Sequence, residues 1–380
     1  MKILIVARGF PTARYPQHGV FEFDQARALA RLGHEVSYIA VDLRSVRRKR
    51  PWGRQSLERD GVQIESMALP IGRLPQPLRS PVYDPFVKSL YHAVEERLGR
   101  PDIVHAHFPD VQESAVRCLA RRGLPVVVTE HSAVVHTRTE SPSKRRATTR
   151  CYRQASAVIA VSRSLAEVLR QEYGVQARVV HNMVDTTLFE FRGTPGAPED
   201  EFRYCSTASL YPGKRLDVLI RGFAALHAVN PKCRLDIFGE GPERARLQSL
   251  IDSQGLQGVA RLNGMHTRAE IAEAYARSHA FALVSGSETF GVAYVEALAA
   301  GLPVVGSRCG GPEDFVGPGD GILVAADANE SEVAAALGQL VDGYSRYDRA
   351  AISGRVREEF SEASVAAQLS AVYHDVMVGA

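Results

Sequence analysis

The chain has 380 residues, 45% of them hydrophobic and 23% charged. This length is too great for one ordinary core and favours two domains. No apolar run approaches the roughly 20 residues that a membrane-spanning helix needs, and the opening MKILIVARGF predicts a first β-strand rather than a signal peptide. The five cysteines are odd in number, scattered and without CxxC spacing, so we expect reduced thiols in a cytoplasmic protein.

The charge differs between the two halves. Residues 1–190 hold 29 Lys and Arg against 19 Asp and Glu, a balance of +10, and residues 191–380 hold 17 against 24, a balance of −7, which together give the net +3. The basic half indicates an anionic partner. Its densest stretch, residues 44–54, is interpreted as a solvated loop, with peripheral contact to anionic lipid as the alternative. No nucleic-acid-binding motif is present, so we expect no nucleic acid partner.

Strand-like and helix-like segments alternate along both halves. In the first half we expect strands at 3–7, 35–41, 103–106, 126–129 and 158–161, and helices at 21–32, 114–122 and 164–171. Residues 191–200 are rich in Pro and Gly and predict a linker. Beyond it, strands are expected at 204–209, 234–238 and 280–284, and helices at 216–229, 292–300 and 361–378. This alternation with apolar strands predicts an α/β fold with parallel, doubly wound sheets.

The stretch 285–307, SGSETFGVAYVEALAAGLPVVGS, carries the strongest chemical signal. Glu288 is expected in a loop after a strand, Gly291 permits the turn there, and Glu296 lies one turn into the next helix. A helix N-terminus preceded by glycine can bind an anion. Carboxylates on either side can accept hydrogen bonds from sugar hydroxyls. Together these features predict a nucleotide-sugar pocket.

The SETFG, VEALAAG and PVVGS pieces of this stretch resemble, in order, the Glu-x7-Glu motif of retaining, nucleotide-sugar-dependent glycosyltransferases of family 4. The resemblance implies the GT-B fold, in which two Rossmann-like domains face each other across a cleft. It places the acceptor-side domain at 1–190, the linker at 191–200, the donor-binding domain at 201–360, and a helix returning to the first domain at 361–380. It implies that Glu296 holds the donor ribose and Glu288 the donor sugar. Backbone N–H groups of Phe290, Gly291 and Val292 would bind the diphosphate.

The segment STASLYPGKRL resembles the part of the family that binds the donor diphosphate with an Arg and a Lys. Lys214 matches the lysine. Ser209 stands where the family has the arginine, and Arg215 replaces the usual glycine after the lysine. Because cations stabilise a departing diphosphate, Arg215, Arg8 or Arg14 would have to supply the missing charge.

Two positions of the first half also match the family. Gly19 precedes a helix, where the family has a glycine-bearing loop near the donor diphosphate; the alternative is a simple turn glycine. His131, in TEHS after a strand, matches a histidine that contacts the donor sugar; alone it would be a loop histidine. In the second half, Met265 in RLNGMH matches a position beside the base, and pocket-wall packing is its other interpretation.

The sequence therefore predicts a glycosyltransferase that moves a sugar from a nucleotide diphosphate donor to a glycan or lipid-linked acceptor, in cell-surface polysaccharide synthesis. His131, Glu288 and Lys214 are its expected catalytic residues. No Asp-x-Asp or other metal-spaced cluster is present, so we expect no metal and no cofactor. We expect a cytoplasmic protein, with contact to the inner membrane face as an extension. A nucleotide-sugar epimerase of the same fold and an inactive nucleotide-sugar-binding scaffold remain alternatives.

Overall fold

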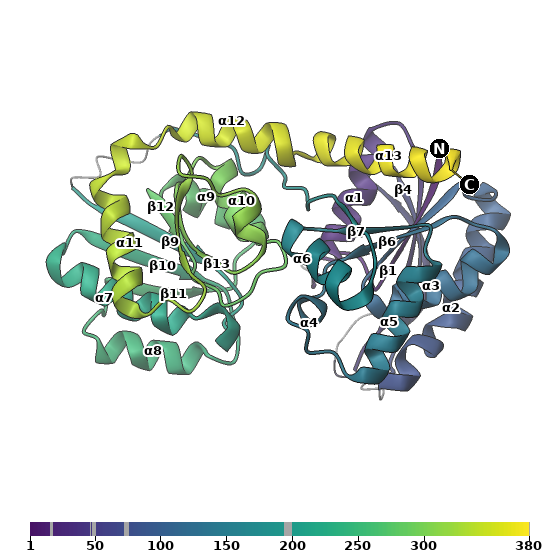
Figure 1. The fold of residues 1–380 in the computed structure, drawn as a ribbon, viewed down its shortest axis with the longest axis horizontal. Coiled ribbons are helices and arrows are strands. Elements are labelled where there is room, and N and C mark those ends of the chain that lie inside the picture. The colour runs from purple at the N-terminus through teal and green to yellow at the C-terminus, as the bar shows by residue number, and fades with distance from the viewer. Residues whose placement is uncertain (16–17, 46, 48–50, 72–75, 194–199, 380) are drawn as a thin grey trace. The chain divides into compact units, whose positions relative to one another are not determined.

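The computed structural model describes the chain except residues 16–17, 46, 48–50, 72–75, 194–199 and 380, and except the side chains of 76–80. The chain forms two compact units (Figure 1): unit 1 is Met1–Met183 with Glu362–Ala380, and unit 2 is Val184–Ser361. Residues 184–190, assigned from the sequence to the first domain, thus belong to unit 2. Residues 194–199 of the predicted linker, and residues 46 and 48–50 of the basic stretch 44–54, lie outside the described residues.

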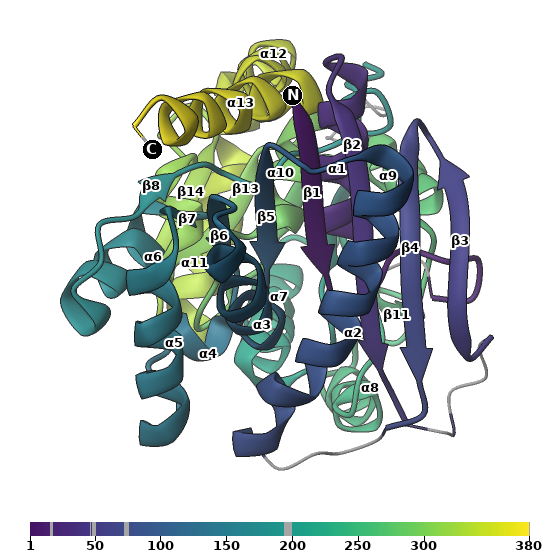
Figure 2. The ribbon, with the colours of Figure 1, turned by 90° about the vertical axis from the view of Figure 1, so that its right-hand side faces the viewer.

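Unit 1 is built on an eight-stranded sheet in the order β3-β4-β2-β1-β5-β6-β7-β8. Its strands are β1 (Lys2–Ala7), β2 (Glu35–Leu43), β3 (Gly53–Arg59), β4 (Val62–Leu69), β5 (Ile103–His107), β6 (Val126–Glu130), β7 (Ala157–Ala160) and β8 (Arg178–Val179). All neighbours are parallel except β3 and β4. Figure 2 shows this pair at one edge of the sheet.

The β3–β4 hairpin was missed in the sequence. Its signal is Asp60-Gly61, the turn dipeptide of a two-residue hairpin, flanked by alternating exposed and covered residues. Both turn residues have positive φ, 55° at Asp60 and 77° at Gly61, as this turn requires. Helix α2 (Gln76–Leu98) was missed as well, because Pro81 and Pro85 lie within its first turns and favour a loop in a sequence analysis.

Helices cover both faces of the unit 1 sheet. On one face α1 (Val20–Arg31) and α13 (Glu362–Val378) bury their apolar sides with β1, β2 and β4 in one core. On the other face lie α2, α3 (Pro109–Leu119) and α5 (Pro142–Gln154), visible in front of the strands in Figure 2. The short α4 (Ala133–His136) and α6 (Arg163–Val168) follow β6 and β7. The helix expected at 114–122 begins earlier, at Pro109, because proline suits the first helical position.

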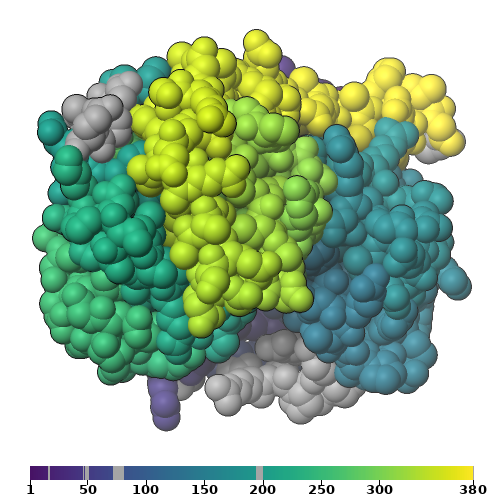
Figure 3. Space-filling model, turned by 60° about the vertical axis from the view of Figure 1, so that its left-hand side comes forward, coloured from purple at the N-terminus to yellow at the C-terminus, as the bar shows by residue number. Residues whose placement is uncertain are grey.

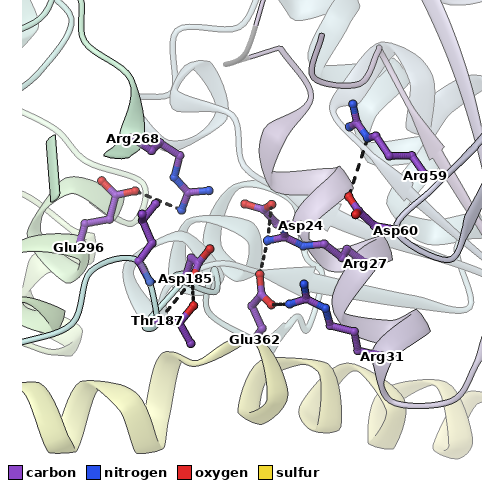
Figure 4. A network of polar contacts seen from close by, with 11 residues as sticks. Asp24, Arg27, Arg31, Arg59, Asp60, Asp185, Thr187, Arg268, Glu296 and Glu362 are labelled. Atoms are coloured by element: carbon purple, nitrogen blue, oxygen red, sulfur yellow. Dashed lines mark hydrogen bonds and ion pairs between the residues drawn. The ribbon is translucent and has the colours of Figure 1, made fainter. Parts of the chain in front are cut away.

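Helix α13 is fixed to unit 1 by polar contacts as well as by its apolar side. Glu362 at its start accepts hydrogen bonds from Arg27 and Arg31 of α1 (Figure 4). At its other end the Tyr373 hydroxyl lies 2.6 Å from Nδ1 of His105 on β5. The last stretch of the chain therefore completes the first unit.

Unit 2 has a six-stranded parallel sheet in the order β11-β10-β9-β12-β13-β14. The strands are β9 (Phe202–Thr207), β10 (Cys233–Phe238), β11 (Ala260–Gly264), β12 (Ala280–Ala282), β13 (Val304–Arg308) and β14 (Gly321–Ala325). The helices are α7 (Leu216–Val229), α8 (Arg244–Ser253), α9 (Arg268–Ala276), α10 (Val292–Ala299), α11 (Glu330–Asp342) and α12 (Arg349–Phe360). Figure 3 shows the segment of α11 and α12, in yellow-green, on the surface of this unit. The predicted α/β class with doubly wound parallel sheets is confirmed.

Each sheet has a point where the strand order reverses. It lies between β1 and β5 in unit 1, and between β9 and β12 in unit 2. Ligands of open α/β sheets bind outside the carboxyl ends of the strands at such points. The loops after these four strands are therefore the places where ligand-binding and catalytic residues are expected. No helix of the described residues is both long enough and apolar enough to cross a membrane.

Candidate functional site

At the switch point of unit 2, an ion pair joins the loops after β9 and β12. Lys214 Nζ lies 2.7 Å from Oε1 of Glu288, and the Ser285 hydroxyl donates to the same oxygen at 2.7 Å. The Glu288 side chain is only 11% exposed. The two residues that the sequence singled out as catalytic in this half are thus brought together, although they are 74 positions apart.

Glu288 is held in place through its backbone. Its N–H donates to the carbonyl of Cys309, and its own carbonyl accepts from Gly311 N–H at 2.9 Å. A Cβ on Gly311 would lie 2.1 Å from the carbonyl oxygen of Phe290, so only glycine permits this approach. The loop of Glu288 is therefore fastened to the loop after β13.

Helix α10 begins directly beyond this loop. Gly291 is its N-cap with φ of 97°, and the first N–H groups of the helix follow at Val292. The Phe290 side chain is buried against Phe315 and Phe360, so only its backbone remains for a ligand. This arrangement supplies the helix N-terminus that the sequence predicted, with Lys214 attached to the same loop.

Glu296 lies further along α10 and faces α9. One carboxylate oxygen is 3.5 Å from Nη2 of Arg268, as Figure 4 shows. Met265, which precedes α9, is exposed. The structure thus shows Glu296 half-buried beside a cation, and it shows Met265 free of the core.

Arg215 is the candidate least available to a ligand. Its guanidinium donates hydrogen bonds to the carbonyl oxygens of Ala326 and Ala328, the second at 2.6 Å. Its backbone has φ of 49°, a left-handed conformation that favours glycine, the residue the family has here. A phosphate would have to compete with two carbonyls for this cation, and Ser209 brings no charge.

In unit 1, His131 follows β6 and joins a stack of aromatic rings. Its Nε2 is 3.1 Å from Nδ1 of His107, and its ring stacks on Phe108 at 5.2 Å between centroids. Burial, together with the nearby Arg8 cation, lowers the pKa of His131 to about 3. The ring is therefore neutral near pH 7, and its buried Nδ1 has no hydrogen-bond partner.

A buried carboxylate shapes the turn that carries His131. Glu130 accepts hydrogen bonds from the backbone N–H of His131 at 2.9 Å and of Ser132 at 2.6 Å, and the Tyr152 hydroxyl donates to its other oxygen. Burial raises the pKa of Glu130 to about 6, in spite of these donors. The sequence pattern indicated His131 but not this support from the residue directly before it.

At the switch point of unit 1, the structure brings together Arg8 and Phe108, a contact that the sequence did not indicate. Arg8 follows β1, and its Cζ lies 3.5 Å from the ring centroid of Phe108, which follows β5. Glu22 in the first turn of α1 is fully buried, and burial raises its pKa to about 7 although Arg8 opposes the shift. Neither Nε of Arg8 nor Oε1 of Glu22 has a hydrogen-bond partner.

Gly19 is the N-cap of α1, with φ of 70°. A Cβ there would lie 2.2 Å from the carbonyl oxygen of Gly9. The two ends of the loop after β1 therefore approach each other closely at this glycine. Beside it lies a cavity of about 520 Å³ lined largely by apolar groups, with residues from the carboxyl ends of β1, β2 and β4 such as Gly9, Ala40 and Met67. Asp42 and Tyr15 also line it.

The described residues hold no group of three or more His, Cys, Asp or Glu side chains that could bind a metal ion.

Comparison with known proteins identifies the family. The model for Glycosyltransferase Family 4 matches residues 19–188, and the model for Glycosyl transferases group 1 matches residues 189–357. A GDP-mannose-dependent alpha-mannosyltransferase of Mycobacterium tuberculosis is 30% identical over 343 residues, which cover 85% of this chain and 84% of the relative. The chain belongs to glycosyltransferase family 4. The predicted family resemblance is thus confirmed.

Other relatives and solved structures agree. This family 4 glycosyltransferase is 28% identical over 314 residues to a D-inositol 3-phosphate glycosyltransferase of Nocardiopsis dassonvillei, covering 74% of this chain and 72% of that one. A sucrose-phosphate synthase structure from Thermosynechococcus elongatus has a TM-score of 0.82 at 19% identity and covers 100% of both chains. HepE of Anabaena in complex with UDP has a TM-score of 0.74 at 18% identity, covering 99% of this chain and 100% of that one. The expected GT-B fold is confirmed; the facing of the two domains across a cleft stays a prediction.

Proposed function

We propose that this glycosyltransferase is a retaining enzyme that transfers a sugar from a nucleotide diphosphate donor to a hydroxyl of a glycan or lipid-linked acceptor. The observation that carries the proposal is the ion pair of Lys214 and Glu288 beside the N-terminus of α10. A cation, a helix N-terminus and a carboxylate are there within one loop cluster at a topological switch point.

Each of these groups has a role in the proposed donor complex. Lys214 and the N–H groups at the start of α10 stabilise the diphosphate, and Glu296 accepts hydrogen bonds from the ribose hydroxyls. Without a donor, Lys214 neutralises Glu288. When the diphosphate binds, Lys214 contacts it as well, and Glu288 orients the hydroxyls of the sugar.

In the proposed reaction the bond between the anomeric carbon and the phosphate oxygen breaks, and the phosphate keeps the electron pair. The acceptor oxygen attacks the same face of the anomeric carbon through an oxocarbenium-like state, and its proton passes to the leaving phosphate. His131, neutral near pH 7, contacts the transferred sugar as a hydrogen-bonding group rather than as a charged acid.

For the acceptor we propose the cavity of unit 1 beside the loop after β1. Its volume of about 520 Å³ is in the range of small-molecule sites, and its walls are largely apolar with a few polar groups such as Asp42. Apolar walls with one carboxylate suit a hydroxyl-bearing acceptor that also has an apolar part, as a lipid-linked sugar does.

No metal takes part in the proposed mechanism, because a lysine and a helix N-terminus already provide positive charge beside the diphosphate. Assay with EDTA and with added Mg²⁺ tests this directly. Equal turnover in both agrees with the proposal, and turnover that needs Mg²⁺ contradicts it.

Peripheral contact with an anionic membrane is part of the proposal for a cytoplasmic enzyme of cell-surface polysaccharide synthesis. Arg146, Arg150 and Arg153 are exposed on α5 at spacings that share a helix face, and in the described part of the chain they form no ion pair. Co-sedimentation with phosphatidylglycerol vesicles, and its loss in the triple Gln variant, would support the contact. Equal sedimentation with phosphatidylcholine vesicles would oppose it.

The proposed function is tested by binding and turnover of purified protein with GDP-mannose, UDP-glucose and ADP-glucose. Relatives and neighbours motivate the first two, as a GDP-mannose-dependent enzyme and as a structure with UDP-glucose. Transfer that needs an acceptor and retains the anomeric configuration by NMR supports the proposal. Donor conversion without an acceptor indicates an epimerase, and binding without turnover indicates a scaffold.

A further inference from the structure

His107 is a fully buried histidine whose side chain is hydrogen-bonded to His131. The two residues lie at the carboxyl ends of neighbouring strands, because His107 ends β5 and His131 directly follows β6. Nδ1 of His107 is 3.1 Å from Nε2 of His131, and the two rings stack with 5.4 Å between their centroids. Within the described part of the chain, the other two ring nitrogens, Nε2 of His107 and Nδ1 of His131, are buried and have no hydrogen-bond partner. Each ring thus has one nitrogen in the shared bond and one that is unsatisfied.

The surroundings of His107 leave His131 as the hydrogen-bonding partner of its ring. The ring of His107 contacts that of His105, with 4.1 Å between centroids. Both nitrogens of His105 are already engaged, Nδ1 with the Tyr373 hydroxyl and Nε2 with the Thr129 hydroxyl, each at 2.6 Å. His105 therefore packs against His107 and does not compete with His131 for its Nδ1.

The bond between the two rings couples the positions of their protons. Burial is the largest cause that lowers the pKa of both His107 and His131, so both rings are neutral near pH 7. A neutral imidazole has one N–H and one bare nitrogen. If His107 donates from Nδ1, the proton of His131 is on Nδ1. If His131 donates from Nε2, its Nδ1 is bare. The direction of this one bond therefore decides whether the unsatisfied nitrogen of His131 is a donor or an acceptor.

The chemistry of imidazole favours donation from His131 to His107. The hydrogen bond made by one nitrogen sets which nitrogen carries the proton, and a neutral histidine without such a constraint prefers the proton on Nε2. When His131 donates from Nε2, both rings have this preferred form, because the proton of His107 is then also on Nε2. The opposite direction places both protons on Nδ1. His131 is also the partly exposed member of the pair, so it is the ring that a ligand can reach.

We propose that His107 is a positioning residue that holds His131 in its Nε2–H form, so that Nδ1 of His131 accepts a hydrogen bond from a hydroxyl of the transferred sugar. The inference rests on the proposed function, in which His131 contacts that sugar. A sugar hydroxyl can donate to a bare nitrogen, and it would satisfy the ring atom that has no partner among the described residues. His107 acts through His131 and does not itself touch the substrate.

Nitrogen-15 NMR of the histidine side chains tests the proton positions in the full chain without any substrate, since it distinguishes an N–H from a bare nitrogen. At pH 7 the wild-type His107 and His131 should both be neutral, with the proton on Nε2. His107→Asn keeps an amide near the place of Nδ1 and should leave His131 in this form. His107→Leu removes the partner, and His131 should then show a mixture of both forms. A proton on Nδ1 of His131 in the wild type overturns the inference.

His105→Asn is the matched control. It changes a buried histidine of the same strand that makes no hydrogen bond to His131, and it keeps an amide near the place of the nitrogen that contacts Tyr373. The nitrogen signals of His131 should therefore stay as in the wild type. If His105→Asn and His107→Leu alter these signals equally, packing of the strand and not the bond to His107 controls His131, and the inference is wrong.

Turnover of the donor measures the positioning role. His107→Leu should lower kcat about 10-fold with a smaller change in KM, because the bond that orients His131 is lost. His107→Asn should recover most of the rate, and His105→Asn should stay near the wild type. An equal loss in His107→Asn and His107→Leu would contradict the role of the bond. If His107→Leu does not fold, the wild-type spectrum and the rate of His107→Asn still decide.

These outcomes separate the inference from the proposed function. Transfer that depends on Lys214 and is unchanged in His107→Leu overturns the inference and leaves the proposed function intact. If the wild type transfers no sugar, the proposed function fails, while a proton on Nε2 of His131 still supports the arrangement of the pair.

Discussion

The switch points of the two units are built alike and differ in how their charges are satisfied. In unit 2, Lys214 is paired with Glu288, and Glu296 lies beside Arg268. In unit 1, the Arg8 guanidinium lies over the ring of Phe108, and among the described residues neither its Nε nor Oε1 of Glu22 has a hydrogen-bond partner. The charged groups at the switch point of unit 2 are thus paired with one another without a ligand. Unit 1 leaves two buried polar atoms without hydrogen-bond partners at the corresponding place.

The largest expected effect is a loss of turnover when the ion pair of Lys214 and Glu288 in unit 2 is broken. Replacing Lys214 by Ala should lower kcat about 10²- to 10³-fold, because it removes the cation nearest the departing diphosphate and leaves the Glu288 charge unpaired. Turnover with the donor identified by binding measures this. Lys232→Ala removes an exposed lysine of the same unit and should keep normal turnover. Near-normal activity of Lys214→Ala would remove this residue from the mechanism.

In unit 1, the buried Glu22 carboxyl should make the unfolding free energy depend on pH. The folded-state pKa of Glu22, about 7, lies above its ordinary value of 4.5, so between these pH values the folded protein keeps a proton that the unfolded chain has lost. Stability should therefore fall as the pH rises through this window, by about 3 kcal/mol in total. Glu22→Gln should abolish this loss.

Urea unfolding at pH 5 and pH 8 measures the Glu22 effect. Glu22→Gln should be more stable than the wild type at pH 8 and about equal to it at pH 5. Glu35→Gln, a change at an exposed carboxylate, is the control. An equal pH dependence in wild type and Glu22→Gln would mean that Glu22 is ionised and satisfied at neutral pH.

A smaller effect is expected from Glu296→Ala. Loss of the ribose contact should weaken donor binding about 10-fold, with less effect on the rate at saturating donor. Equilibrium binding of the nucleoside diphosphate measures it. Glu273→Ala is the matched control, because it removes an exposed carboxylate of α9 that is paired with Arg192. If Glu296→Ala binds the nucleotide normally, the ribose assignment is wrong.

The smallest effect concerns the support of His131. Tyr152→Phe removes one donor from the buried Glu130 carboxylate and should cost about 1 to 3 kcal/mol of unfolding free energy. Tyr91→Phe removes a similar hydroxyl from the less buried Glu95 and should cost less. Denaturant titration compares the two. Equal costs would show that burial at Glu130 is not what makes its hydrogen bond important.

Much of the fold could be predicted from the sequence, as could the proximity of the candidate residues around Glu288 in unit 2. Continuous apolar runs and helices that end at glycine predicted most of the strands and helices. The stretch from Glu288 to Glu296 predicted the loop and the helix N-terminus that the structure shows beside Lys214. The hairpin of β3 and β4 had a signal at Asp60-Gly61 that was overlooked. The pairing of Arg8 with Phe108 had none, because residues 100 positions apart reveal neither their contact nor the absence of other partners until the chain is folded.

The return of α13 to unit 1 has a consequence for how the protein is made. Unit 2 begins and ends at one place, since Val184 N–H donates to the carbonyl of Phe360 at 2.8 Å and Val184 pairs with Ser361. During synthesis every residue of unit 2 leaves the ribosome before α13 does. Unit 2 can thus complete its core while the apolar residues of α1 that pack against α13 are still uncovered in unit 1.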